Sequence, residues 1–517
     1  MNGAELLLTT LTSNGVSVCF ANPGTSEMHF TAALDQTQGM RGILVLEEGV
    51  ATGAADGYAR MTDQPAATLL HLGPGLANGL SNLHNGLRAR SGIINIVGDH
   101  ATYHRALDAP LTSDIEGTAR AFSNWVRTST SPQMIGPDTA DAIGIGQSNG
   151  IATLILPADV AWNQSPKCDP ITAALRPTRP EPDPTVIAAA ARELRQNGRR
   201  CAILLGGKSL NEEQLKLAAQ ISVATGATVL SDTFVPKTKR GGGRFPTMKV
   251  PYPIKESTAL FSNFDAVMLI DTKAPVSFFA YPNQSSILTQ PGTRIYQVSP
   301  INADSCSALA ELEDLIVDAS HPRPTPLAVS LPSKPTGRIS GAKFTTWLAA
   351  TIPENAVVID EIGTSGPNLF NDTATARPHD LISATGGSIG YALPTAVGAS
   401  IACPDRTVIA LESDGSGMYK LQALWTQARE GLKVINVVFA NRRYQTLRNE
   451  MTNVGAGRLE ADETASLLDI DNPTISWVDL ARGMGVAAHR VETMEELDTM
   501  FDAAMKTDGP SLIELIL

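Results

Sequence analysis

Residues 406–447 read RTVIALESDGSGMYKLQALWTQAREGLKVINVVFANRRYQTL, and this stretch decides the fold. The β-branched apolar run 408–411 predicts a buried strand, which stops at the polar residues 412–416. Apolar side chains at helical spacing follow, and Gly431 ends that helix. A second apolar run, 434–440, predicts a parallel strand. Strand, helix and strand form one right-handed βαβ unit, so both strands end at the same edge of the sheet.

Asp414 and Asn441 follow these two strands, so we expect them to lie side by side at that edge. One carboxylate and one amide oxygen suit Mg²⁺, which prefers a few protein oxygens together with phosphate oxygens and water. Gly415 and Ser416 are expected to open the crossover helix, whose free N–H groups favour a phosphate. Asp-Gly-Ser is also a common turn, which is the alternative interpretation. The strand–turn–helix–strand–Asn context favours a magnesium-bridged diphosphate.

The same stretch resembles the GDG…NN signature of the thiamine-diphosphate (ThDP) decarboxylase and acetolactate synthase superfamily. Ser413 replaces the first Gly and Ala440 the first Asn, while both metal-ligand positions are intact. The resemblance implies that Asp414, Asn441 and the main-chain carbonyl of Arg443 hold Mg²⁺. A main-chain ligand tolerates any side chain, so an Arg is compatible with this position. The resemblance also implies cofactor contacts from Asp414, Gly415, Ser416, Asn441 and Tyr444.

Length and composition are those of an ordinary globular protein. The chain has 517 residues, 43% apolar and 18% charged, enough for two to four domains with buried cores. A net charge of −12 argues against nucleic acid and anionic membranes as partners. No apolar run approaches the roughly 18 residues of a membrane span, and the first residues lack a basic start. Five dispersed Cys without a CxxC pattern indicate a reduced, cytoplasmic protein.

Two proline-rich stretches, 165–184 and 321–335, predict extended linkers. They divide the chain into the blocks 1–165, 185–325 and 340–517. Each block alternates apolar strands with amphipathic helices, which predicts α/β architecture with three doubly wound parallel-sheet domains. By resemblance these are an N-terminal ThDP pyrimidine-binding domain, a central Rossmann-like domain and a C-terminal diphosphate- and Mg-binding domain.

In the first block, the predicted strand 42–46 runs into Glu47 and Glu48. From composition alone, both could be charges favoured at a helix N-terminus. The following residues match the family pattern E-x-x-x-x-G-x-A-[DE]-G-Y-A, which places Glu48 at the family's catalytic glutamate. A carboxyl group that forms a hydrogen bond with N1′ of ThDP favours the 4′-imino tautomer, whose nitrogen removes the C2 proton. Apolar surroundings raise the pKa of such a carboxyl and keep its proton shared with the ring.

Other candidate groups also follow strands of this block. The strand 67–71 ends at His71 and Gly-Pro-Gly, which resembles the SGPGATN loop of acetolactate synthases. His71 falls where benzoylformate decarboxylases have an active-site His, and Thr25 falls on their active-site Ser. A structural His at a strand end is the alternative interpretation. His100 and His104 follow strand 93–97 and are candidate proton donors, although loop-tip His residues are often only solvated. The segment that follows matches neither class, and we expect it to determine the substrate.

The second block has predicted strands at 201–205, 228–230, 266–269 and 293–298. Its turn at 206–208 lacks GxGxxG, so neither a dinucleotide nor FAD is expected. The basic, glycine-rich run 237–244 is expected to be a mobile loop. Ala280 falls where benzoylformate decarboxylases have a second catalytic His, which argues against benzoylformate as the substrate.

In the third block, strand 356–359 leads to Gly363 and Thr364, where the family holds the diphosphate. The segment 383–391 resembles the loop that grips the aminopyrimidine. There Gly387 offers its carbonyl to the amino group, and Ile389 props the cofactor into a V shape that brings the 4′-nitrogen against C2. Further strands are expected at 478–480, 486–491 and 511–517.

The resemblance implies a ThDP- and Mg-dependent lyase or transferase that decarboxylates a small 2-oxo acid. The product is released after protonation or is joined to an aldehyde or a second 2-oxo acid. The family's sites lie between subunits, which implies a homodimer or homotetramer. One alternative is a catalytically silent ThDP-binding regulatory subunit, which the presence of Glu48 and both metal positions disfavours. Another is a ThDP-dependent C–C lyase acting on another substrate class.

Overall fold

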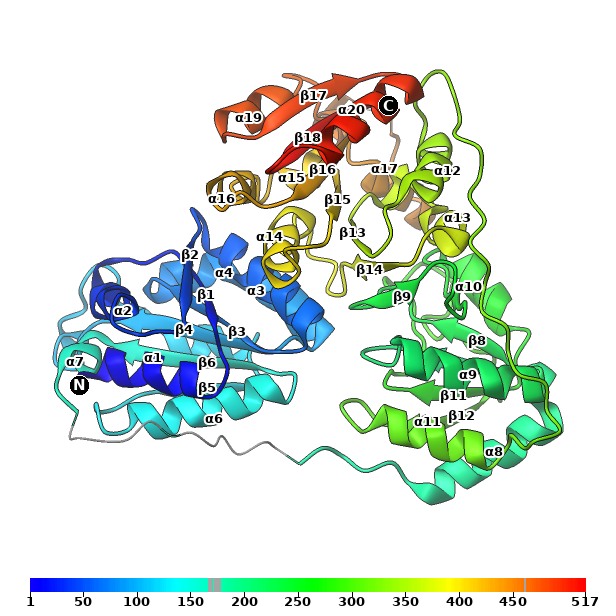
Figure 1. Ribbon diagram of the computed structural model, residues 1–517, viewed down its shortest axis with the longest axis horizontal. Helices are drawn as coiled ribbons and strands as arrows, with labels where there is room; N and C mark the ends of the chain where they lie inside the picture. The colour runs from blue at the N-terminus through cyan, green and yellow to red at the C-terminus, as the bar shows by residue number, and fades with distance from the viewer. Residues whose placement is uncertain (166–170, 172–177, 460–461) are drawn as a thin grey trace.

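The computed structural model describes residues 1–517 apart from 166–170, 172–177 and 460–461. Three β-sheets flanked by helices follow one another along the chain, with one exchanged strand (Figure 1). This arrangement confirms the predicted α/β class with three parallel-sheet domains. Within the described ranges, no helix is long and apolar enough to span a membrane.

The first domain is built on a parallel sheet in the order β2-β1-β3-β4-β6-β5. Helices α1 and α6 cover one face and α3 and α4 the other, which explains why the inner strands are apolar on both faces. The strands are β1 (Val18–Ala21), β2 (Arg41–Leu44), β3 (Ala66–Leu70), β4 (Ile93–Asp99), β5 (Trp125–Thr128) and β6 (Ile151–Pro157). The helices are α1 (Gly3–Ser13), α2 (Met28–Leu34), α3 (Glu48–Thr62), α4 (Leu72–Ala89), α5 (Ile115–Arg120), α6 (Ile135–Gln147) and α7 (Ala158–Trp162).

The second domain has a parallel sheet in the order β10-β8-β7-β11-β12. Its strands are β7 (Cys201–Leu205), β8 (Thr228–Ser231), β10 (Met248–Lys249), β11 (Ala266–Ile270) and β12 (Arg294–Ser299). Its helices are α8 (Pro184–Asn197), α9 (Glu212–Thr225), α10 (Ile254–Phe261) and α11 (Ser305–Asp314). Helices α8, α9 and α11 pack on one face of this sheet, and α10 packs on the other.

The third domain has a sheet in the order β17-β18-β16-β15-β13-β14-β9, parallel except for β9. Its own strands are β13 (Ala356–Asp360), β14 (His379–Ser383), β15 (Val408–Ser413), β16 (Val434–Ala440), β17 (Ala487–Val491) and β18 (Ser511–Ile516). Its helices are α12 (Gly341–Thr351), α13 (Leu369–Asp372), α14 (Ala392–Ala402), α15 (Asp414–Gly417), α16 (Ala423–Arg429), α17 (Gln445–Val454), α18 (Asp462–Leu468), α19 (Trp477–Gly483) and α20 (Met494–Met505).

The predicted strand–helix–strand unit is present, because β15 and β16 are parallel neighbours from Val408↔Val434 to Ser413↔Phe439. The crossover differs from the prediction. Residues 414–417 form the short helix α15, and the longer helix α16 begins only at Ala423. Gly415 and Ser416 therefore open a single turn and not the whole crossover, since two glycines within four residues favour helix poorly.

Residues 478–480 were predicted as a strand, and this prediction is wrong: they lie within α19. Ser476 caps this helix by accepting a hydrogen bond from the backbone N–H of Asp479 (3.4 Å). Trp477 and Ala481 are fully buried and four positions apart, which is helical periodicity. Residues 478–480 are Val-Asp-Leu, and so short an alternation of apolar and polar residues fits either type of element.

The basic run 237–244 is not the mobile loop that the sequence suggested. Residues Thr238–Arg240 form β9, which leaves the second domain and pairs antiparallel with β14 in the third. The side chain of Arg240 is buried, with its guanidinium carbon 3.5 Å from the centre of the Phe370 ring. A cation over an aromatic face in a dry environment is a stabilising contact, so this segment is fixed in place.

The two proline-rich stretches differ in how much of them is described. Residues 166–170 and 172–177 of the first lie outside the described residues, so the linker there stays a prediction. The second, 321–335, contains neither helix nor strand. Leu327 in this second stretch exchanges backbone hydrogen bonds with Gly243 and Arg244 (2.7 and 2.9 Å), so the linker follows the surface beside β9.

The first and third domains share one hydrophobic core, in which α3 lies between α4 and α14 (Figure 1). A Cβ on Gly398 would lie 1.8 Å from the carbonyl oxygen of Ala54, and a Cβ on Gly57 would lie 2.2 Å from that of Thr395. Only glycine permits so close an approach of α3 to α14. The position of α3 in this core fixes the residues at its N-terminus relative to the third domain.

Arg60, on α3, connects all three domains. It is 4% exposed and pairs with Asp56 on its own helix through two hydrogen bonds (2.6 and 2.8 Å). Its guanidinium also donates to the carbonyl of Pro236 in the second domain (3.3 Å) and to that of Ser383 in the third (2.8 Å). A buried guanidinium is tolerated only when its donors are satisfied, and here four partners satisfy them, since Thr385 accepts as well (3.1 Å).

Arg60→Met is expected to lower the free energy of unfolding by about 3–5 kcal/mol, because it leaves the carboxylate of Asp56 buried without its partner. The measurement is the denaturant midpoint followed by circular dichroism. The control is Arg120→Met, whose pair with Glu116 is exposed and is expected to contribute little. Equal midpoints for the two variants would contradict the structural role of Arg60.

Candidate active site

The polar groups of the site gather at the carboxyl ends of four adjacent strands of the third sheet. Asp414 follows β15, Asn441 follows β16, Gly363 lies just after β13, and the loop 384–391 follows β14. The carboxylate oxygen Oδ2 of Asp414 accepts a hydrogen bond from the backbone N–H of Arg442 (2.6 Å). Asp414 and the segment that begins with Asn441 therefore lie side by side, as the strand pairing predicts.

The three expected metal ligands lie on the turn after β15 and on the segment after β16. Oδ1 of Asn441 faces the N–H of Arg443 (3.1 Å), and its Nδ2 lies 3.5 Å from Oγ of Ser365. Arg443 lies opposite Asp469 in an isolated antiparallel β-bridge. The backbone hydrogen bonds of this β-bridge are made by residues 442 and 444, on either side of Arg443. The carbonyl of Arg443 accepts no hydrogen bond in the described part of the chain. It is thus free to bind a cation.

Burial raises the pKa of Asp414 to about 6, while the backbone N–H groups of Arg442 and Gly415 act in the opposite direction. A cation next to this carboxylate would favour its charged form. Across the described residues, His, Cys, Asp and Glu side chains form no group of three that could hold a metal. The set found here is of another kind, with one carboxylate, one amide and one main-chain carbonyl, which suits Mg²⁺.

The expected diphosphate contacts surround this set. Gly363 has φ +45° and begins a short 3₁₀ turn, Gly363–Ser365, in which Thr364 is exposed. A Cβ on Gly415 would lie 2.7 Å from the ring of Tyr444, so Tyr444 packs directly on the 414–417 turn. The hydroxyl of Ser416 is occupied by Glu412. Ser416 is therefore available to a phosphate through its main chain rather than its side chain.

A buried pair of carboxyl groups, Glu361 and Glu412, lies directly behind the site and was missed in the sequence. Glu412 is fully buried, and burial together with the negative charge of Glu361 raises its pKa well above the usual range. Both effects favour the neutral form of Glu412. The signal in the sequence is an ionisable residue at the end of each apolar strand, immediately before a cofactor motif.

In the first domain, Glu47 and Glu48 have different roles. Glu47 caps α3 by accepting the N–H of Val50 (3.0 Å) and pairs with Lys420 of the third domain (2.8 Å). Glu48 begins the helix and is 7% exposed. Its two carboxylate oxygens accept hydrogen bonds from the side-chain amides of Asn22 and Asn78, both 3.0 Å. Glu47 is thus committed to structure, and Glu48 is held by two neutral donors that do not neutralise its charge.

His71 lies beside Glu27, another residue that the sequence did not suggest. Its Nδ1 is 2.8 Å from Oε2 of Glu27, which is 1% exposed, and 3.4 Å from Oγ of Ser26. When the imidazole is neutral, this contact places the proton on Nδ1 and leaves Nε2 as the basic nitrogen. Thr25 is exposed, and the hydroxyl that contacts His71 belongs to Ser26. The sequence NPGTSE holds two consecutive hydroxyl residues, Thr25 and Ser26, and it does not show which of them contacts His71.

His100 and His104 lie together on the loop after β4, with ring centroids 5.3 Å apart. Neighbouring Asp99 pairs with Arg105 (2.6 Å), and burial raises the pKa of Asp99. Nε2 of His100 is buried without a hydrogen-bond partner in the described ranges. The two rings take no part in the hydrogen bonds, described above, that hold Glu48 and His71.

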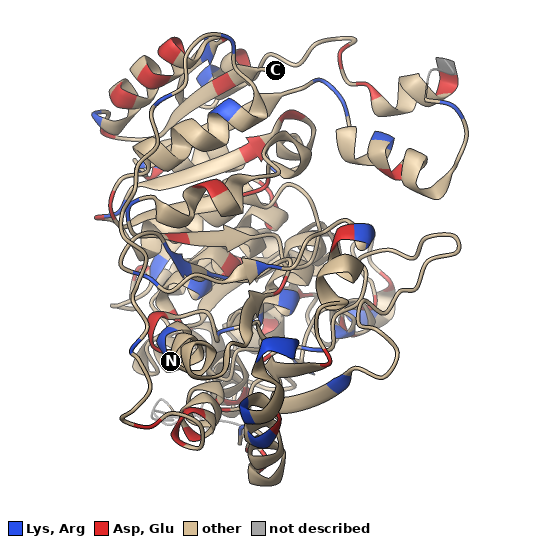
Figure 2. Ribbon diagram, turned by 90° about the vertical axis from the view of Figure 1, so that its right-hand side faces the viewer, with Lys and Arg blue, Asp and Glu red and all other residues tan. Residues whose placement is uncertain are grey.

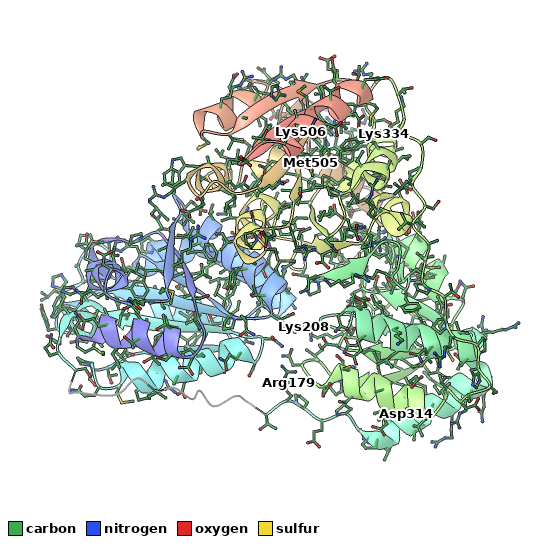
Figure 3. All side chains as sticks on the ribbon, in the orientation of Figure 1. Arg179, Lys208, Asp314, Lys334, Met505 and Lys506 are labelled. Carbon is green, nitrogen blue, oxygen red and sulfur yellow. The ribbon has the colours of Figure 1, made fainter. Side chains whose placement is uncertain are left out.

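The crevice at the carboxyl edge of the second sheet, where a dinucleotide would bind, is filled from the first domain. Arg90 at the end of α4 pairs with Asp271 after β11 and also donates to its carbonyl (2.9 Å). A Cβ on Gly207 would overlap the Arg90 guanidinium. Lys208, labelled at this junction in Figure 3, bonds Asp63 of the first domain (2.9 Å). Figure 2 shows acidic and basic segments interleaved over the face it presents.

Comparisons with known proteins agree with this geometry. Residues 1–121 match the N-terminal TPP binding domain of thiamine pyrophosphate enzymes, and residues 361–515 match the C-terminal TPP binding domain. A Mycobacterium tuberculosis protein with the provisional name acetolactate synthase large subunit IlvX is 45% identical over 519 residues, covering 100% of this chain and 99% of the relative. Benzoylformate decarboxylase of Pseudomonas aeruginosa is 25% identical, covering 98% of this chain and 97% of the relative.

Solved structures show the same fold. The ThDP-dependent 4-hydroxybenzoylformate decarboxylase of Rhodococcus jostii RHA1 superposes with a TM-score of 0.85 at 22% identity, covering 99% of this chain and 98% of that one. Benzoylformate decarboxylase of Polynucleobacter necessarius gives a TM-score of 0.85 at 21% identity, covering 100% of this chain and 99% of that one. At this level of identity, the likeness extends to the fold alone.

Asp414→Ala is expected to weaken ThDP binding in the presence of Mg²⁺ by at least about 10–100-fold, because it removes the only carboxylate of the proposed ligand set. Isothermal titration with ThDP, with and without Mg²⁺, measures the change. Asp405→Ala, at an exposed turn of the same domain, is the control. ThDP affinity that depends on Mg²⁺ equally in both variants would contradict the ligand assignment.

Proposed function

Because the chain belongs to the thiamine pyrophosphate enzyme family that includes acetolactate synthases and benzoylformate decarboxylases, we propose that it decarboxylates a small 2-oxo acid. The cofactors in this proposal are ThDP and Mg²⁺. When bound, ThDP supplies the electron sink that allows the carboxyl group of the substrate to leave. The observation that carries the proposal is Glu48, a largely buried carboxylate held by two neutral amides.

Glu48 has the surroundings that its proposed role requires. The role is to hydrogen-bond N1′ of the aminopyrimidine and so make the 4′-amino group a base. Glu48 is 7% exposed, and Asn22 and Asn78 hold its carboxyl group in one orientation without forming an ion pair. A lysine or arginine in their place would fix the charge permanently and suppress proton sharing with the ring.

Asp414, Asn441 and the Arg443 carbonyl would hold Mg²⁺ against the diphosphate. The uncommitted carbonyl of Arg443 supports this assignment, because a cation binding there would displace no hydrogen bond within the described residues. Gly363, Thr364 and the 414–417 turn would contact the phosphate oxygens from the adjacent strand ends.

His71 is the proposed proton donor or acceptor near the substrate. Its contact with Glu27 orients the ring, which suits a group that exchanges a proton with a carbon or oxygen of the product. This pair supports simple decarboxylation. The second candidate is carboligation to an acceptor carbonyl, and the 45% identity to a protein named acetolactate synthase supports it.

The complete site is proposed to form between two copies of the chain. Large apolar side chains are exposed beside both halves of the site. In the first domain Tyr103 and Leu107 are each 69% exposed, and in the third domain Ile389, Met418 and Tyr419 are exposed. A second copy would bury them, bringing Glu48 of one subunit to the diphosphate site of the other.

The second domain is proposed to hold no flavin. Arg90 and Asp271 occupy the crevice at the strand ends. Asp232, whose pKa burial raises to about 6, adds a second carboxyl group there. Carboxyl groups and a filled crevice oppose the binding of a diphosphate. Under this proposal, the purified protein lacks the absorbance of a bound flavin.

Glu48→Gln is expected to lower kcat by about 10²–10⁴-fold, because an amide cannot share its proton with N1′. ThDP affinity is expected to change little. The measurement is carbon dioxide release at saturating ThDP and Mg²⁺, with Glu116→Gln at an exposed helix as the control. Turnover in Glu48→Gln that equals the control would exclude the proposed role.

Incubation with a panel of 2-oxo acids tests the reaction itself, and the products separate the alternatives. Carbon dioxide with an aldehyde indicates a decarboxylase, and carbon dioxide with an acyloin indicates a carboligase. Tight ThDP binding without carbon dioxide from any member of the panel would contradict the proposal in favour of a silent subunit.

A further inference from the structure

The loop 384–391 lies where the three domains meet. A Cβ on Gly386 would lie 2.6 Å from Oδ1 of Asn85, which belongs to α4 of the first domain. A Cβ on Gly387 would lie 2.6 Å from the ring of Phe278, which belongs to the second domain. The loop itself joins β14 to α14 in the third domain. Its conformation is therefore set from outside as well as by its own sequence.

Asn85 is fully buried and holds the middle of the loop. Its Nδ2 donates to the carbonyl of Ser388 (2.8 Å), and its Oδ1 accepts from the N–H of Ser388 (3.2 Å). The side-chain amide thus pairs with both backbone groups of one residue, as a neighbouring strand would. The hydroxyl of Thr385 donates to the backbone carbonyl of Asn85 (2.9 Å), which adds a third contact.

Glu361, at the end of β13, holds the other end of the loop. Its Oε1 accepts from the N–H of Gly390 (2.6 Å), and its Oε2 accepts from those of Tyr391 and Ala392 (both 2.8 Å). These donors include the first N–H groups of α14, a helix that has no side-chain cap of its own. A carboxylate there satisfies three backbone donors and is favoured by the helix dipole.

Gly387 and Ile389, the two loop residues expected to face the cofactor, lie between the two anchors. Ser388 is fixed by Asn85 and Gly390 by Glu361, while Gly387 and Ile389 are exposed, Ile389 by 40%. Fixing the residues on either side of Ile389 restricts the backbone from which its side chain projects. A prop that positions a ligand must itself be rigid.

The first anchor also connects to the helix that carries Glu48. Nδ2 of Asn85 donates to Oδ1 of Asn82 (2.9 Å), and Nδ2 of Asn82 donates to the carbonyl of Gly49 (2.9 Å). Asn82 is 1% exposed, so this chain of amides is shielded from water. The loop and the first turn of α3 are thereby held in register.

We propose that Asn85 and Glu361 are positioning residues for the reaction. Acting through the backbone at Ser388, Gly390 and the first turn of α14, they hold the Gly387 carbonyl and the Ile389 side chain in the cofactor-binding arrangement before the cofactor arrives. This inference rests on the proposed function, because the loop has this task only if ThDP binds.

The test uses the full-length protein with two variants and two matched controls. Glu361→Gln keeps the shape but places an NH₂ group opposite at least one backbone N–H donor, and Asn85→Ala leaves both backbone groups of Ser388 unpaired. Glu193→Gln and Asn95→Ala are the controls, because each alters a buried, hydrogen-bonded side chain away from the loop. Denaturant midpoints establish that variant and control lose comparable stability.

Four readouts test the two variants against their controls. Backbone amide exchange at 386–392, measured by mass spectrometry without cofactor, is expected to accelerate in Asn85→Ala and Glu361→Gln only. ThDP affinity, measured by titration with Mg²⁺, is expected to fall about tenfold, because each variant leaves backbone groups of the loop without their partner. Exchange of the C2 proton of bound ThDP for deuterium, measured by NMR, is expected to slow, because the 4′-nitrogen is held less well against C2. At saturating ThDP, kcat is expected to fall with little change in KM.

Loop exchange, ThDP affinity and C2 exchange that match the controls in both variants would overturn the proposal, as would equal losses in the variants and the controls. If Asn85→Ala does not fold, the isosteric Glu361→Gln decides alone. Wild-type protein that binds no ThDP would refute the proposed function and the inference with it. Wild-type protein that binds ThDP, with variants indistinguishable from it, would refute the inference only.

Discussion

The pairing of parallel strands is the constraint on which the rest of this structure depends. Parallel neighbours end at the same edge, so β13, β14, β15 and β16 deliver four sets of polar residues to one line at the surface of an apolar core. Those groups cannot all be solvated, and backbone N–H groups donate hydrogen bonds to Glu361 and Asp414 instead. The chemistry of the site and the architecture of the sheet are thus two results of the same packing.

In the first domain, amide side chains form the hydrogen bonds that the buried polar groups need. Asn22 and Asn78 hold Glu48, and Asn82 and Asn85 bridge α3 to the loop before α14. Amides can donate and accept at once and carry no charge, so they pack between helices without fixing the charge of a neighbouring carboxyl. An ion pair is found instead at the neighbouring residue, Glu47, which binds Lys420 across the domain boundary.

Local signals in the sequence were sufficient for β15, β16 and the three-domain architecture, because long apolar runs and their turns are short-range features. They failed at 478–480, because the short sequence Val-Asp-Leu fits a helix as well as a strand. They also failed at β9, since a basic, glycine-rich segment gives no hint of a partner strand some 140 residues later in the chain. Glu27, Ser26, Glu361 and Glu412 were missed for the same reason, because their importance lies in contacts that only the folded chain makes.

The exchanged strand β9 has a consequence for how this protein can be rebuilt. Residues 238–240 belong by sequence to the middle of the chain, yet they form the outer border of the last sheet and carry the arginine stacked on Phe370. A chimera that replaces the whole middle segment with that of a relative therefore also replaces the border of the domain it was meant to leave intact. A chimera should therefore keep residues 238–240 of the recipient and exchange only the rest of the middle segment. The structural boundary of the third domain includes this strand, although the strand lies outside the domain in the sequence.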